Sequence, residues 1–272
     1  MDGTPLVKRL DFAFPTEAEA LRQDQYLLLD SMLVAPVNPF VNGTKPWTEG
    51  QTGVDPKQPG SFNRTREVWI PPGEWEDAYS GATVTGPKVL SRAAVPLEQT
   101  VLYHRRPSIA VTARRKGRNA ATTDVDDLVV EAFPSSGASG TQRTTRELWS
   151  SDGRVGATVE LEEHAAGSAA AAAHCEGRDV DQAASMRLLT LRVTGDVSGS
   201  KTWTARLHLP PNQRLANVDT SAILAVVPPL EAGAAQAAPL GGQGARPSAQ
   251  AGAVVEAALS GGEQQALRLC VL

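Results

Sequence analysis

The stretch "REVWIPPGEWEDAYSG", residues 66–81, places two short runs of alternating apolar and polar residues on either side of a Pro-Pro-Gly sequence. Such alternation is typical of half-buried β-strands. Proline and glycine favour turns, so Pro71, Pro72 and Gly73 are predicted to form the turn of a β-hairpin. The stretch therefore indicates antiparallel β-structure.

The same pattern continues to the end of the chain. Short apolar or alternating runs follow one another, separated by turn residues, which predicts antiparallel β-sandwiches. Residues 114–124 are charged and then small and polar, as expected of a boundary between two modules. Residues 231–253 are of low complexity and are predicted to be a loop. The candidate strands are "KVLSRAAV", "TVLYHRRPSIAVTA", "DLVVEAF", "RELWS", "ATVELEE", "MRLLTLRVT", "TWTARLHL", "AVVEAALS" and "QALRLCVL".

The first 37 residues have a different pattern. Residues 5–15 are predicted to form a strand that ends at Pro15, and residues 16–28 a helix that Thr16 caps. The apolar run at 31–37 is typical of a buried strand. Farther along, the alanine-rich segment 162–179 fits a helix and a loop equally well.

Composition excludes several classes of function. The net charge of −4 provides no positive field for nucleic acid. No apolar run approaches the roughly 20 residues of a membrane span, and the first residues lack the apolar core of a signal peptide. The compartment stays open. Cys175 and Cys270 lie far apart, which indicates neither a disulfide framework nor a metal site. Asn42 and Asn63 begin N-glycosylation sequons.

The acids of the opening stretch do not predict a catalytic pair. Hydrolysis of a glycoside requires two carboxyl groups that face each other across the scissile bond. Glu67, Glu74, Glu76 and Asp77 are instead interpreted as solvated surface charge, since nothing on a wet strand would separate their pKa values.

The aromatic residues leave two interpretations open. Trp69 and Trp75 are expected in the core, because large aromatics dominate sandwich cores. Together with Trp47, they could instead stack against a sugar ring. The four histidines show no zinc-site spacing, and there is no P-loop or dinucleotide fingerprint. The residues by themselves predict no catalytic, cofactor-binding or metal-binding site.

Three blocks of the sequence resemble the C-terminal part of glycoside hydrolase family 31, the α-glucosidase family. The first is "GTPLVKRLDFAFP" (3–15) with "DQYLLLDSMLVAPV" (24–37). The second, within residues 66–111, is "REVWIPPGEWEDAYSGATVTGPKVL" with "VPLEQTVLYHRRPSIAV". The weaker third block is "LVVEAFP" with "RTTRELWSSDGR". Leu29 departs from the family pattern, which has glycine before Asp30.

The resemblance implies a fold and a division into domains. Family members have a (β/α)₈ catalytic barrel followed by proximal and distal β-sandwiches. Residues 1–29 would be the barrel's last strand-helix unit, residues 30–117 the proximal sandwich, and residues 118–272 the distal sandwich. The fold class expected is therefore mainly β, with two antiparallel β-sandwiches after a barrel remnant.

The resemblance also implies a function. Family members are retaining α-glycosidases, whose nucleophile and acid/base aspartates lie on earlier barrel strands that this chain lacks. The chain is thus expected to support a barrel, on the same or a separate chain, without catalytic residues or cofactors of its own. The alternatives are a freestanding module that binds α-glucan or oligosaccharide, and a structural module that docks a separate catalytic chain.

Overall fold

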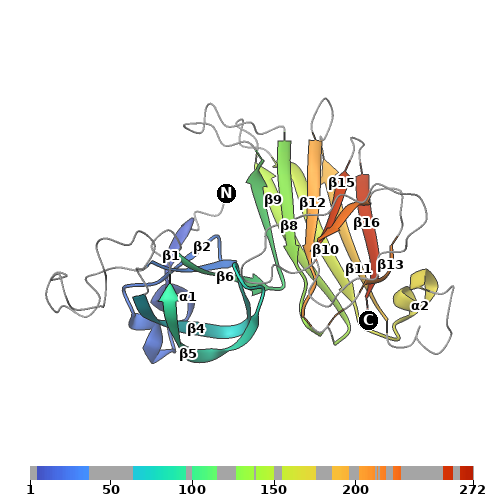
Figure 1. The fold of residues 1–272 in the computed structure, drawn as a ribbon. Coiled ribbons are helices and arrows are strands. Elements are labelled where there is room, and N and C mark those ends of the chain that lie inside the picture. Colours follow the sequence, from blue (N-terminus) through green and yellow to red (C-terminus); the bar gives the residue numbers. More distant parts are fainter. Residues whose placement is uncertain are drawn as a thin grey trace, which may run out of the picture. The chain divides into compact units, whose positions relative to one another are not determined.

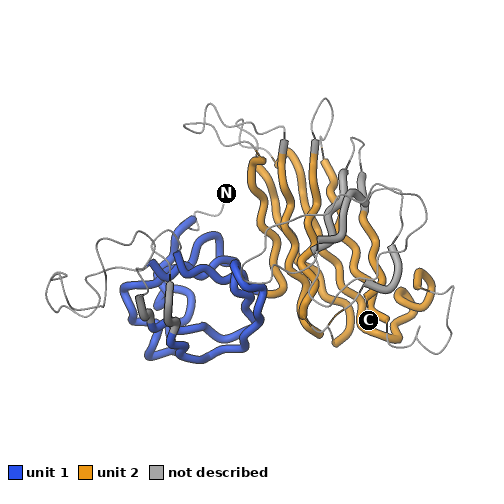
Figure 2. The backbone as a smooth tube through the Cα atoms, in the orientation of Figure 1, with its two compact units in different colours: residues 1–105 blue, residues 106–272 orange. Residues whose placement is uncertain are grey.

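The β-runs of the sequence form three sheets. The computed structural model describes residues 5–36, 64–95, 100–114, 127–137, 139–149, 155–175, 186–195, 202–211, 213, 215–218, 223–227, 254–259 and 264–271. The chain divides into two compact units, residues 1–105 (unit 1) and residues 106–272 (unit 2), as Figure 2 shows in blue and orange. Each unit is described separately below.

Unit 1 is built on one six-stranded sheet that curls around its own core (Figure 1). Two short helical elements, α1 (Leu10–Ala13) and the 3₁₀ helix η1 (Ala18–Leu21), follow its first strand. The strands in sheet order are β1 (Val7–Arg9), β2 (Tyr26–Leu28), β3 (Met32–Ala35), β6 (Val101–Arg106), β4 (Arg64–Asp77) and β5 (Thr83–Val95).

Tryptophan rings lie at the centre of the unit 1 core. Trp69 and Trp75 are buried together with apolar side chains from the strands and from α1. Phe14 meets Trp69 edge to face, with ring centroids 5.9 Å apart. The Gln25 side chain pairs with the Trp69 backbone as a neighbouring strand would: its Nε2 donates to the Trp69 carbonyl (2.9 Å), and its Oε1 accepts from the Trp69 N–H (3.0 Å). The Gln25 side chain therefore satisfies both backbone hydrogen-bonding groups of Trp69.

The helix predicted for residues 16–28 is wrong. Only Ala18–Leu21 is helical, as a single 3₁₀ turn, and Tyr26–Leu28 forms β2 instead. Strand β2 pairs with both β1 and β3, and these tertiary contacts outweigh a weak local helix preference. The assignment of residues 1–29 to a barrel remnant, and the boundary at residue 117, stay predictions.

The prediction of a turn at the Pro-Pro-Gly sequence is also wrong. Strand β4 runs through this sequence without a break, and the register with β5 shifts between Ile70 and Gly73, which marks a β-bulge. Gly73, at φ 116°, has a conformation that suits glycine. Across the ladder, a Cβ on Gly86 would overlap the Pro71 carbonyl, so only glycine fits there. The chain reverses later, between the end of β4 at Asp77 and the start of β5.

The turn between β2 and β3 contains two residues in the left-handed region. Leu29 has φ 56° and Asp30 has φ 60°. Aspartate tolerates this region, whereas a leucine side chain approaches the following carbonyl and costs about 1–2 kcal/mol there. Lys8 Nζ holds the turn through an ion pair with Asp30 Oδ2 at 2.6 Å. The glycine that the family pattern has at this position is therefore explained by the backbone.

We expect Leu29→Gly to stabilise unit 1 by about 1 kcal/mol, because glycine relieves the left-handed strain. Thermal unfolding of the full chain measures this as a higher melting temperature. Leu28→Gly is the matched control, since Leu28 lies in β2 and glycine weakens strands. A lower melting temperature for Leu29→Gly would contradict the explanation.

Unit 2 is a sandwich of two five-stranded sheets (Figure 1). One sheet has the order β13 (Leu215–Val218), β16 (Gln264–Val271), β11 (Arg187–Gly195), β10 (Val155–His164) and β9 (Thr141–Trp149). The other has the order β14 (Ile223–Val227), β15 (Val254–Leu259), β12 (Thr202–His208), β8 (Asp127–Phe133) and β7 (Ser108–Ala113).

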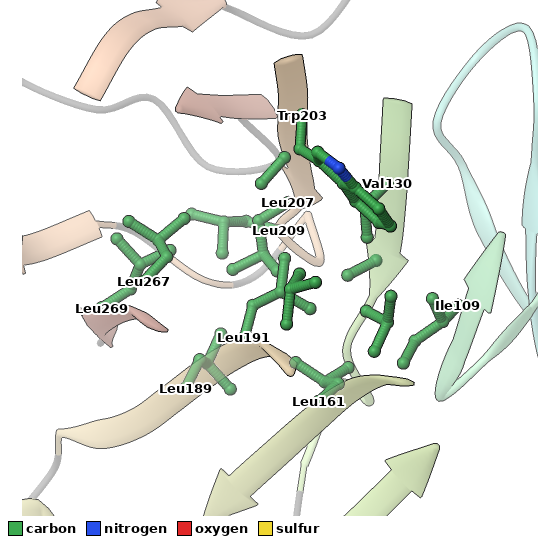
Figure 3. Close-up of a cluster of buried hydrophobic side chains, with 14 of the residues drawn as sticks. Ile109, Val130, Leu161, Leu189, Leu191, Trp203, Leu207, Leu209, Leu267 and Leu269 are labelled. Atoms are coloured by element: carbon green, nitrogen blue, oxygen red, sulfur yellow. The ribbon is translucent and has the colours of Figure 1, made fainter. Parts of the chain in front are cut away.

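The core of unit 2 lies between these sheets, as Figure 3 shows with side chains from both. Alternate residues of β10, β11, β12 and β16 supply it, as the sequence pattern predicts, so the sandwich expected for this part of the chain is confirmed. One pairing differs from the expected antiparallel arrangement: β8 and β12 run parallel. Sequence alternation fixes which face of a strand is buried but is the same for both strand directions.

The cysteine spacing did not indicate a disulfide framework, yet the structure contains a disulfide bond. Cys175 and Cys270 are bonded to each other, 95 residues apart in the sequence. Cys175 ends α2 (Ala169–Cys175), so the alanine-rich segment that fitted a helix or a loop contains a short helix. Cys270 lies on β16. Among the described residues, no helix has both the length and the apolar character that crossing a membrane requires.

Candidate functional site

The rings proposed for sugar stacking lie in different surroundings. Trp69 is 2% exposed and Trp75 is 0% exposed. Trp75 also donates its indole Nε1–H to the Pro71 carbonyl at 2.9 Å. Both rings are covered by protein, so neither offers a free face to a sugar. Trp47, Asn42 and Asn63 lie outside the described residues.

The interpretation of the hairpin acids as solvated charge is wrong for two of them. Glu76 is 6% exposed and Asp77 is 2% exposed, whereas Glu67 is exposed to solvent. Asp77 Oδ1 accepts the backbone N–H groups of Tyr79 (2.9 Å) and Ser80 (3.1 Å). Aspartate commonly holds turns in this way. Asp77 therefore forms the β4–β5 turn.

Unit 2 contains a buried charged cluster, formed by Ser135, Glu163 and Arg187, that we call the Glu163 cluster. Arg187 Nη2 contacts Glu163 Oε2 at 2.7 Å. Ser135 donates its hydroxyl to the same oxygen at 2.8 Å and its backbone N–H at 3.1 Å. Burial raises the pKa of the Glu163 carboxyl, while the Ser135 and Arg187 contacts act in the opposite direction.

The Glu163 cluster holds the chain segment that follows β8. Arg187 Nη1 donates to the Ser135 carbonyl at 3.0 Å. Gln213 Nε2 donates to the Ser136 carbonyl at 2.9 Å, and Arg106 Nη1 donates to the Pro134 carbonyl. The Glu163 side chain has no exposed surface. Closed off from solvent and bonded to its neighbours, the cluster fixes a loop and cannot reach a substrate.

Sequence reasoning missed this cluster, although the strand pattern contains a signal for it. On β10 the buried positions are Val159 and Leu161, and Glu163 comes next in the same alternation. On β11, Arg187 precedes Leu189 and Leu191 at the buried parity. Opposite charges at buried positions of neighbouring strands indicate an internal ion pair.

On the outer face of the same sheet, the charges behave as ordinary surface pairs. Glu160 contacts Arg192 (2.9 Å) and Arg143 (3.4 Å), and Glu162 contacts Arg143 at 3.1 Å. Arg143 is more than half exposed. Such pairs contribute little to stability. Within the described ranges, no three His, Cys, Asp or Glu side chains come together in a way that could hold a metal ion.

The largest exposure of apolar side chains lies at the start of unit 1. Phe12 and Leu21 are each 67% exposed, Leu6 60% and Val7 52%. They come from β1, α1, η1 and the residue before β1, and α1 contacts both β1 and η1. We call these four residues the N-terminal apolar patch. They fall within sixteen positions of one segment, and exposed apolar side chains that gather on one surface are typical of interaction sites.

The apolar run at 31–37, predicted to be a buried strand, contains β3, in which Leu33, Val34 and Ala35 are buried. Leu27, Leu33 and Ala35 are at most 2% exposed, because β2 and β3 turn these side chains into the unit 1 core.

The chain resembles known proteins in sequence and in fold. Residues 3–110 match the family model of the glycosyl hydrolase family 31 C-terminal domain. No curated protein matches the sequence significantly. The structure is similar to the GH31 dextranase FjDex31A of Flavobacterium johnsoniae, complexed with glucose, at a TM-score of 0.55 and 14% identity, over 98% of this chain and 29% of that one.

A second similar structure is the cycloalternan-forming enzyme of Listeria monocytogenes in complex with pentasaccharide substrate, with a TM-score of 0.52 and 16% identity. The match covers 98% of this chain and 21% of that enzyme. At these identities the likeness concerns the fold alone, and this chain spans less than a third of either protein. Residues 3–110 are thus similar in sequence to the C-terminal domain of glycosyl hydrolase family 31, and the chain as a whole shares its fold with parts of these two enzymes.

Proposed function

We propose that this chain is a non-catalytic C-terminal portion of a family 31 glycosidase and that it packs against a catalytic barrel, on the same or a separate chain. The parent enzyme would hydrolyse α-glycosidic bonds with retention, through a glycosyl intermediate on a barrel aspartate. The observation that carries the proposal is the N-terminal apolar patch, which lies inside the segment that matches the family model.

The contacts of the buried acids favour a non-catalytic role for the chain. Two of the described buried acids, Glu163 and Asp77, hold a loop and a turn. A retaining glycosidase needs two carboxyl groups about 5–5.5 Å apart at an open site. A purified chain is therefore expected to give no turnover of an aryl α-glucoside, and turnover that survives purification to homogeneity would overturn the proposal.

We expect Phe12→Ser and Leu21→Ser each to weaken binding to a family 31 barrel that lacks its own C-terminal domains by about tenfold or more. Burial of a large apolar side chain contributes about 1.5–3 kcal/mol, and 1.4 kcal/mol corresponds to a factor of ten. Titration calorimetry with the FjDex31A barrel, produced without its C-terminal part, provides the measurement.

Val89→Ser is the matched control, because Val89 is 43% exposed on β5, outside the N-terminal apolar patch. It should leave the affinity unchanged. Circular dichroism of each variant verifies that the fold is intact. Equal affinities for the patch variants and the wild type would show that the barrel does not cover this surface.

We propose, as an alternative, that the chain binds an α-glucan or an oligosaccharide. Trp149, at the end of β9, is 42% exposed and pairs in register with Val155, which is 43% exposed. An exposed indole offers a ring face that Trp69 and Trp75 lack. A saturable change in tryptophan fluorescence on titration with maltose, lost in Trp149→Ala, would favour this alternative.

A further inference from the structure

The disulfide joins two elements on the outer face of a unit 2 sheet. On β11, Leu189, Leu191 and Val193 point into the sandwich core. Leu188 occupies an alternate position of β11, so its side chain points to the outer face of the sheet. It pairs in register with Cys270 of β16. A separate small apolar cluster forms there beneath α2, made of Ala171, Cys175, Met186, Leu188 and Cys270.

Helix α2 covers this cluster but has little to hold it in place. It is seven residues long, five of them alanine. Isolated helices shorter than about 12–15 residues are marginal in water. Only Ala171 and Cys175 of α2 are buried. Ser168 supports the first turn, where its hydroxyl accepts the Ala171 N–H at 3.2 Å.

The bond also secures the strand that the chain reaches last. Strand β16 lies between β11 and β13, and its side chains Leu267, Leu269 and Val271 belong to the main core. The disulfide ties it to a helix that lies 95 positions earlier. Closure of a loop of this length removes much of the conformational entropy of the unfolded chain. The bond is therefore placed where it both fastens α2 and retains β16.

We propose that the Cys175–Cys270 disulfide is a redox-dependent closure of unit 2, and that the chain acquires it in an oxidising compartment. With the bond formed, α2 covers Met186 and Leu188. With the bond reduced, α2 leaves the sheet, these apolar side chains meet solvent, and β16 loses its tether. Disulfides persist in oxidising compartments and are rare where thiols are kept reduced.

The chemistry is a thiol–disulfide exchange with an oxidised dithiol carrier. The Cys175 and Cys270 thiols lose two electrons and two protons as the Sγ–Sγ bond forms. The carrier's disulfide takes up both electrons and both protons and leaves as a dithiol. A small-molecule dithiol runs the same reaction in reverse.

The test compares the full chain with and without a dithiol reductant. Before reduction, a maleimide should label no cysteine in the denatured chain, which contains two in total. After reduction, both should be labelled, and the melting temperature of unit 2 should fall by about 5–15 °C. A dye that binds exposed apolar surface should gain fluorescence. The transition of unit 1, which contains no cysteine, is the internal reference.

Variants separate the bond from the side chains. The double variant Cys175→Ser, Cys270→Ser should melt at the temperature of the reduced wild type and should not respond to reductant. Ala173→Ser, on the exposed side of α2, is the matched control and should behave like the wild type. The proposal is overturned if the oxidised wild type carries free thiols, if reduction leaves the unit 2 transition unchanged, or if the double variant melts like the oxidised wild type.

A second experiment, in bacterial cells, tests whether unit 2 depends on an oxidising compartment. The same chain is produced in a bacterial cytosol with its thiol-reducing systems intact and in one where they are disabled. The disulfide-bonded, folded form should dominate only in the second host. Equal yields of stable, folded protein with free thiols in the first host would show that unit 2 does not depend on an oxidising compartment.

Discussion

Glu163→Ala is expected to destabilise unit 2 by about 3–5 kcal/mol, because it leaves the Arg187 guanidinium buried without its carboxylate. Arg187 is 7% exposed and Glu163 is 0% exposed, so water cannot replace the lost partner. The Ser135 hydroxyl and backbone N–H lose their acceptor as well. The loss should appear as faster hydrogen exchange in peptides from β10 and β11 and as a lower urea midpoint.

Two comparisons make this prediction specific. Glu160→Gln removes a carboxylate from the outer face of the same strand and should cost clearly less, about 1 kcal/mol, since Glu160 is partly exposed and one of its partners, Arg143, is more than half exposed. Glu163→Ala combined with Arg187→Met should cost clearly less than the sum of the two single changes, because partners in one network are not additive. Additive losses would show that the two side chains act independently.

Trp75→Ala is expected to destabilise unit 1 by about 3–5 kcal/mol, the range for a fully buried ring that leaves a cavity. The Trp75 indole has no exposed surface, and its loss also leaves the Pro71 carbonyl without its Nε1–H donor. Trp75→Phe should have an intermediate effect, because it restores most of the volume but not the hydrogen bond. Denaturant unfolding of the full chain measures both.

The control is on the same hairpin. Tyr79, just beyond the end of β4, is 42% exposed, so Tyr79→Ala should change stability by about 0.5 kcal/mol or less. A Trp75→Ala chain as stable as the wild type would contradict the burial. The expected collapse of unit 1 also means that loss of a sugar response in Trp75→Ala would not identify a sugar site.

The strand pattern predicted the positions of most strands because alternation is local. Every second residue of β10, β11 and β16 points into the main core of unit 2, and the sequence shows this period directly. The segment 16–28 failed because its helix preference was weak and β2 found partners on both sides. β13 and β14, four and five residues long, lie in a part of the chain where no strand was predicted.

The candidate sites depended on information that is not local. The Pro-Pro-Gly sequence has a strong turn preference, yet pairing of β4 with β5 across Gly86 accommodates it as a bulge. Nearness in sequence made Glu76 and Asp77 look like surface acids, whereas the curled sheet buries both. The N-terminal apolar patch was not predicted, because the sequence does not show which apolar side chains are covered by the rest of the chain.

By itself the sequence determined the β-class, the sandwich of unit 2 and the resemblance of residues 3–110 to family 31, since these rest on short-range periods and on motifs. Only the tertiary structure decided that Cys175 meets Cys270, that Glu163 meets Arg187 and that β8 runs parallel to β12. These contacts depend on strand order across the sheets, and strand order is set by the packing of the whole unit. Side chains alternate between the two faces of a strand with a period of two residues, whatever the order or direction of the strands. This period therefore could not distinguish one strand arrangement from another.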